Sequence, residues 1–159
     1  MRSPRLWVML VSFALALLLT ILPLPPEWET LRPQWVAMVL LYWNLYFPER
    51  IGVFWGWSVG IALDATTESV LGQHALSFSV IAWIAIELHR RIRLFPLVQQ
   101  SLSVWVLLLI ERLLSLWIMG ATGTPTPSLV YWVPTLLGLL LWFGFFFLLR
   151  DLRHRLGVG

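Results

Sequence analysis

The chain has 159 residues, of which 59% are hydrophobic and 12% are charged. A soluble domain carries roughly 45–50% apolar and about 25% charged residues, so this composition excludes an ordinary water-soluble fold and indicates a single integral membrane domain, 1–159. The net charge of +3 is too small for a nucleic-acid surface, and the absence of Cys excludes disulfides, thiolate metal sites and cysteine nucleophiles.

Six apolar segments follow one another along the chain, and we expect an all-α protein in which each segment is a transmembrane helix. Four are long enough to cross a hydrocarbon core about 30 Å thick, which takes roughly 20 helical residues. The second and third segments are short, with lengths of about 20 Å as helices. The predicted spans are residues 6–24, 34–47, 51–63, 70–88, 97–119 and 129–149.

The two short segments allow two interpretations. They are either two short spans in a locally thinned bilayer or one re-entrant hairpin that turns at residues 48–50. The distribution of arginine favours two spans, because six spans place nine arginines in loops and ends on one side and only Arg32 on the other. This asymmetry predicts a bacterial inner-membrane protein with both termini in the cytoplasm. The nine are Arg2, Arg5, Arg50, Arg90, Arg91, Arg93, Arg150, Arg153 and Arg155.

The third segment carries glycine at every fourth position. Gly52, Gly56 and Gly60 therefore share one helical face, and small residues at this spacing let the backbone of another helix approach closely. We expect this face to pack within the bundle, and the alternative is a seam for another protein. Asp64 continues the face at the outer boundary.

Asp64 itself has two interpretations. It either ends a helix in water or orders the following turn against a partner or ligand. Gln73 and His74 follow within reach, but one His without Cys or a second His is a poor metal site. We therefore predict no metal ligand here.

Two ionisable residues, Glu111 and Arg112, lie inside the fifth segment, where a charge costs at least about 2.5 kcal/mol at the membrane centre. As neighbours on a helix they point about 100° apart and do not face one another. Glu111 needs a hydrogen-bond donor, which another helix could supply. Structural pairing, contact with a partner and a proton or ion path are the three interpretations.

The basic residues Arg90, Arg91 and Arg93 are predicted to lie in a cytoplasmic loop. They are most simply determinants of orientation that sit beside anionic lipid headgroups, and a docking site for a cytoplasmic protein is the alternative. No catalytic or phosphate-binding motif is present in the sequence, so we predict no catalytic residue and no cofactor.

An ordered set of short motifs resembles the family of rod-shape-determining MreD proteins. Further along, the Arg-rich loop, Gln99-Gln100 and the Arg-bearing tail occur in the same order as in that family. The motifs are Arg32-Pro33-Gln34-Trp35, Leu41-Tyr42-Trp43, Pro48-Glu49-Arg50, Gly56-x3-Gly60-x2-Leu63-Asp64 and Leu71-Gly72-x2-Ala75-Leu76.

This resemblance implies a non-enzymatic inner-membrane component of the cell-elongation machinery that scaffolds or regulates peptidoglycan synthesis. It implies direct contact with MreC, and a complex with MreB, RodA and a penicillin-binding transpeptidase. The family's fold is similar to the substrate-binding subunits of energy-coupling-factor vitamin transporters, so a small-molecule carrier subunit is the alternative. A carrier would need polar groups from several helices at one depth, and beyond Glu111, Arg112 and Asn44 the predicted spans offer few.

Overall fold

The computed structural model describes residues 6–22, 34–48, 51–66, 72–123 and 132–155, which form six α-helices and no strand. The expected all-α class is confirmed. The helices are α1 (Leu6–Ile21), α3 (Trp35–Tyr46), α4 (Val53–Thr66), α5 (Gln73–Leu94), α6 (Leu97–Ala121) and α7 (Val133–Arg155).

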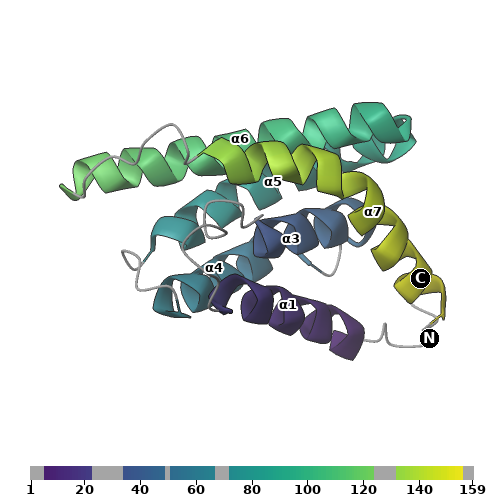
Figure 1. Ribbon diagram of the computed structural model, residues 1–159, viewed down its shortest axis with the longest axis horizontal. Helices are drawn as coiled ribbons and strands as arrows, with labels where there is room; N and C mark the ends of the chain where they lie inside the picture. Colours follow the sequence, from purple (N-terminus) through teal and green to yellow (C-terminus); the bar gives the residue numbers. More distant parts are fainter. Residues whose placement is uncertain (1–5, 23–33, 49–50, 67–71, 124–131, 156–159) are drawn as a thin grey trace.

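Helix α5 packs against α3, α4 and α6. Helix α7 lies along α6, and α1 lies along α3. Figure 1 shows α6 and α7 along one edge of the molecule and α1 along the opposite edge, with α3, α4 and α5 between them. The start of α1 and the end of α7 lie at the same end of the bundle.

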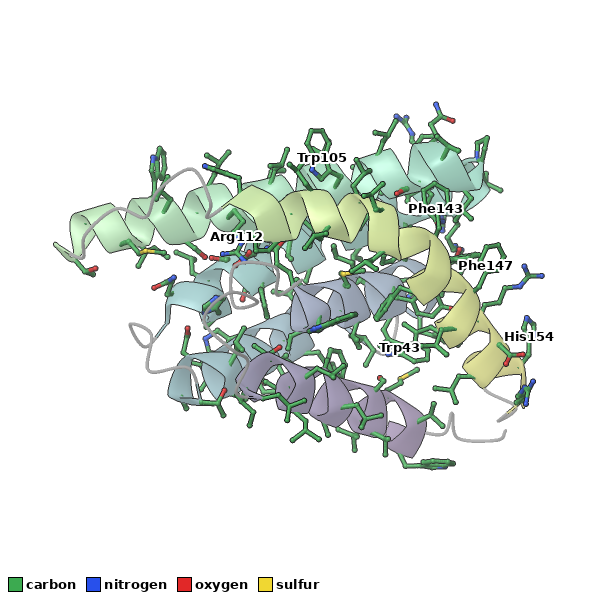
Figure 2. All side chains as sticks on the ribbon, in the orientation of Figure 1. Trp43, Trp105, Arg112, Phe143, Phe147 and His154 are labelled. Atoms are coloured by element: carbon green, nitrogen blue, oxygen red, sulfur yellow. The ribbon has the colours of Figure 1, made fainter. Side chains whose placement is uncertain are left out.

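The short helix α3 forms the interior of the bundle. Its ten residues 36–45 are all buried, as expected for a helix that is apolar on every side. Trp43 and Tyr42 are among its fully buried side chains, and Trp142 of α7 is fully buried as well. The Trp43 indole donates a 2.9 Å hydrogen bond to the Ser12 hydroxyl of α1, which fixes α1 against α3 (Figure 2).

The outer helices carry the apolar surface of a membrane protein. Within the described residues, Leu97–Ala121 and Pro134–Leu152 are long and apolar enough to cross a bilayer. Only 28% and 22% of the most apolar 18-residue stretch of each helix is buried, so most of that surface faces outward. Side chains such as Leu113, Trp117 and Leu140 are more than half exposed. A water-soluble monomer rarely shows so much apolar surface.

Two helices extend further than the apolar pattern predicted. Helix α5 continues to Leu94, so Arg90, Arg91 and Arg93 lie on its last turns and not in a loop. Helix α7 likewise continues through the basic tail to Arg155. Hydropathy marks where a segment stops being apolar, whereas arginine is a good helix former and basic groups are favourable at a helix C-terminus.

Candidate functional site

Asp64 lies in the last turn of α4, and its carboxylate caps the start of α5. The backbone N–H groups of Gly72 and His74 each donate to it at 3.0 Å, and that of Ala75 donates at 3.4 Å. These N–H groups have no acceptor within their own helix, and a negative charge is favourable at this end. Asp64 is 1% exposed, so solvation in water does not explain it.

The geometry of this cap depends on Gly72. Its φ of 100° places it in the left-handed region that glycine adopts without strain. The chain can therefore reverse between α4 and α5 while its N–H still points at Asp64.

His74 connects this cap to α6. Its Nδ1 lies 2.7 Å from Asp64 Oδ1, and its Nε2 lies 3.9 Å from Glu111 Oε1. The His74 side chain is 20% exposed, whereas the two carboxylates are 0% and 3% exposed. An imidazole at the edge of the bundle therefore stands between two buried acidic groups.

Glu111 obtains its hydrogen-bond donors from other positions. Gln34, which precedes α3, donates from Nε2 to Oε2 at 2.6 Å, and Ser115 donates to Oε1 at 3.0 Å. The Gln34 Oε1 atom accepts a 3.3 Å hydrogen bond from Thr135 of α7. Ser77 of α5 lies 3.2 Å from Ser115 through the two hydroxyl oxygens.

The outer network, as we call these residues, joins five elements: the start of α3, α4, α5, α6 and α7. Its members are Gln34, Asp64, His74, Ser77, Glu111, Ser115 and Thr135. Sequence reasoning proposed Asp64 and Glu111 but did not assign roles to Ser77, Ser115 or Thr135. These three residues could have been identified from the sequence because each is polar within an apolar segment, and a polar group in a membrane needs a protein partner.

Arg112 follows Glu111 on α6 and is half-buried. Figure 2 shows it on the side of α6 that faces the rest of the bundle. Its side chain leaves the helix in a different direction from that of Glu111, as the separation of about 100° between neighbours on a helix requires.

The three glycines of the third segment have different surroundings. A Cβ on Gly60 would lie 2.5 Å from Ala75 Cα, and a Cβ on Gly56 would lie 2.9 Å from the Phe78 carbonyl oxygen. Both glycines therefore allow the backbone of α5 to approach α4. Gly52 has nothing within 4 Å of the same position and takes no part in this contact.

A second polar cluster, the inner network, surrounds Gln100 of α6 and was not singled out as a site from the sequence. Its Nε2 donates to the Tyr46 hydroxyl at 3.1 Å and to the Ile92 carbonyl at 3.3 Å. Its Oε1 accepts a 3.2 Å hydrogen bond from the indole of Trp142. One amide therefore joins α3, α5, α6 and α7.

Five exposed arginines lie at one end of the described molecule. Arg90, Arg91 and Arg93 are exposed at the end of α5, and Arg150 and Arg155 are exposed at the end of α7. Both helices end at the same end of the bundle (Figure 1). These positions fit contact with anionic headgroups, which stays a prediction.

The described residues hold no group of three or more His, Cys, Asp or Glu side chains placed to bind a metal ion. The outer network pairs its acidic groups with amide, hydroxyl, imidazole and backbone N–H donors. Its geometry is suited to joining helices.

Comparisons with known proteins agree on one family. The family model for rod shape-determining protein MreD matches residues 1–152. The rod shape-determining protein MreD of Haemophilus influenzae strain Rd is 32% identical over 154 residues, which cover 94% of this chain and 93% of that protein. No solved structure matches the chain.

Proposed function

Because this chain belongs to the MreD family of rod shape-determining proteins, we propose that it is a non-enzymatic component of the machinery that elongates rod-shaped cells. The family establishes a role in cell shape, and the helices are those of a membrane protein. The match along nearly the whole of both chains is the observation that carries the proposal.

In this proposal the chain is a multi-pass protein of the bacterial inner membrane that contacts MreC directly. It acts in a complex with MreB, RodA and a penicillin-binding transpeptidase, and it positions or regulates peptidoglycan synthesis. Placement of partners requires a rigid body with a large outer surface. Support comes from the two polar networks, which join the helices, and from the apolar faces of α6 and α7.

A substrate-binding subunit of a vitamin-type transporter is the second candidate. One observation favours it: polar groups from several helices do converge, in the outer network. Those groups, however, form hydrogen bonds with one another, and most are buried. We therefore assign them to holding the bundle together and retain the scaffold as the function.

Depletion of the protein from a rod-shaped bacterium that depends on it separates these candidates. The scaffold predicts round or swollen cells, unchanged nutrient uptake, and recovery of cell-wall synthesis proteins when the tagged chain is purified from membranes. Cells that stay rod-shaped but require a supplied vitamin would contradict the scaffold. Recovery of a transporter ATPase with the tagged chain would support the carrier.

A further inference from the structure

Helices α4 and α5 together form a face of the bundle whose apolar length is short. Helix α4 has 14 residues and therefore extends about 21 Å. It begins at Val53, and Asp64 in its last turn accepts the Gly72 N–H just before α5 begins. The chain reverses direction there, so α4 reaches no further through a membrane. The hydrocarbon core of a bilayer is about 30 Å thick.

Helix α5 gives the same length from a different observation. Glu87 is exposed and lies 14 positions after Gln73, the first residue of the helix, which corresponds to about 21 Å. The exposed side chains between them, Leu76 and Trp83, are hydrophobic. An exposed ionised carboxylate is costly in hydrocarbon, and the exposed Arg90 follows one turn later. Glu87 therefore marks one limit of lipid contact on this face.

Aromatic rings mark the same limit on both helices. Phe54 and Trp57, in the first turns of α4, are 74% and 48% exposed, and their rings stack with centroids 5.9 Å apart. Trp83 of α5 is 59% exposed, one turn before the carboxylate. A Cβ on Gly56 would lie 3.2 Å from the Ala82 Cβ, so these rings lie at about the same level of the bundle. Trp is enriched where hydrocarbon meets the lipid headgroups.

The edge formed by α6 is longer. Its exposed hydrophobic side chains recur on one side of the helix, at Val98, Leu102, Val106, Leu113 and Trp117. Nineteen positions separate the first from the last, which corresponds to about 29 Å and matches an ordinary hydrocarbon core. Figure 1 shows α6 extending past the end of α4 at the end of the bundle away from the start of α1. The molecule therefore presents apolar belts of two lengths.

We propose that the short face, meaning the exposed side of α4 and of residues 73–86 of α5, is covered by lipid whose hydrocarbon core is locally thinned to about 21 Å. Along α6 the bilayer keeps its ordinary thickness. A core of ordinary thickness at the short face would bury about 9 Å of polar or charged helix in hydrocarbon. A long helix fits a thin bilayer by tilting, whereas a short helix cannot lengthen, so the lipid adapts.

Thinning on one side gives the protein a preference among membranes. The strain in the lipid falls where acyl chains are short, or where another molecule with a short apolar face shares the thinned patch. This preference rests on the membrane environment alone. A test of it is therefore separate from the test of the role in cell shape.

The first measurement is thermal unfolding of the whole chain in nanodiscs of phosphatidylcholine with acyl chains of about 14 to about 22 carbons. We expect the unfolding temperature to be highest with short chains and to fall by about 5 °C or more toward the longest. Glu87→Leu lengthens the belt on α5 by about one turn, so the optimum should move to longer chains by about two carbons. Gln99→Leu is the matched control, because Gln99 is exposed on the long edge, and it should leave the optimum unchanged.

A second measurement locates the bilayer surface at both ends of the short face and decides the matter if Glu87→Leu does not fold. The chain has no Cys, so Ala65→Cys, Glu87→Cys and Val106→Cys each carry a single spin label. Ala65 and Glu87 are exposed at opposite ends of the short face. In a bilayer of ordinary thickness we expect a water-soluble nickel complex to reach both of these labels, and dissolved oxygen to reach the label at position 106.

Tilting of the whole molecule in an unthinned bilayer brings only one end of the short face to the surface, so the pair of labels separates tilting from thinning. A hydrocarbon depth for either Ala65→Cys or Glu87→Cys would overturn the proposal. So would an unfolding temperature that is independent of chain length or highest in the longest chains, or an optimum that a folded Glu87→Leu variant leaves in place.

Discussion

Gly60 has no room for a side chain, because the backbone of α5 lies where its Cβ would be placed. We expect Gly60→Ala to lower the free energy of unfolding by about 1–3 kcal/mol, the usual cost of overpacking. Gly52→Ala is the control and should cost less, since Gly52 precedes α4 and a Cβ there meets nothing within 4 Å. Thermal unfolding in detergent measures both variants. Equal stability of the two would contradict the close contact between α4 and α5.

Asp64 is the residue whose loss should disturb the outer network most. Asp64→Ala removes the acceptor of the N–H groups of Gly72 and His74, and a buried group left without a partner costs about 1–3 kcal/mol. Asp64→Asn keeps one carbonyl oxygen and should cost less. Denaturant unfolding followed by circular dichroism compares them.

Asp151→Ala is the control for that series. Asp151 forms an exposed ion pair with Arg155 at 2.9 Å, and an exposed i,i+4 pair contributes only about 0.3–0.5 kcal/mol. If Asp151→Ala lowered the free energy of unfolding as much as Asp64→Ala, burial and capping would not distinguish the two carboxylates.

In the inner network, the side-chain amide of Gln100 joins four helices. Gln100→Leu leaves the Trp142 indole and the Tyr46 hydroxyl without this partner, so we expect a loss of about 1–3 kcal/mol in the free energy of unfolding. Gln99→Leu, at an exposed neighbouring position, should change stability by less than about 0.5 kcal/mol. Thermal unfolding checks the pair, and similar midpoints would mean that Gln100 does not join these helices.

The helices also show why the apolar segments needed correction at their ends. The α4 helix continues to Thr66, which brings Asp64 inside its last turn and within reach of α5. Helix α5 continues past its apolar part because hydrogen bonding along the backbone does not stop where hydropathy falls. The existence and order of the helical segments could be predicted from hydropathy. Hydropathy did not show where α4 and α5 end, so it did not show that Asp64 and Arg93 lie in the last turns of these helices.

At the scale of the whole molecule, the placement of arginine predicts the orientation in the membrane. A reporter fused after Gly159 should be cytoplasmic, and reporters inserted at Glu29, Glu68 or Gly123 should be periplasmic. Positions 29, 68 and 159 lie outside the described residues. Alkaline phosphatase and fluorescent protein fusions provide the measurement. A cytoplasmic signal at Glu68 would contradict six spans and favour the re-entrant hairpin.

The sequence by itself determined the helical class, the membrane environment and the family resemblance. Each of these depends on local properties: runs of apolar residues, the length of a helix, and short motifs in a fixed order. The same local properties identified Asp64 and Glu111 as unusual, because a carboxylate within or beside an apolar span is costly wherever it points.

Only the tertiary structure decided which polar groups meet. Gln34 lies 77 residues before Glu111 and 101 residues before Thr135, yet all three are joined by hydrogen bonds. Their meeting depends on how each helix is rotated about its axis. In a soluble helix that rotation is marked by one apolar and one polar face, but in a membrane the side facing lipid and the side facing the protein are both apolar. The sequence therefore carries little signal for rotation, and the packing of α3, α6 and α7 sets it.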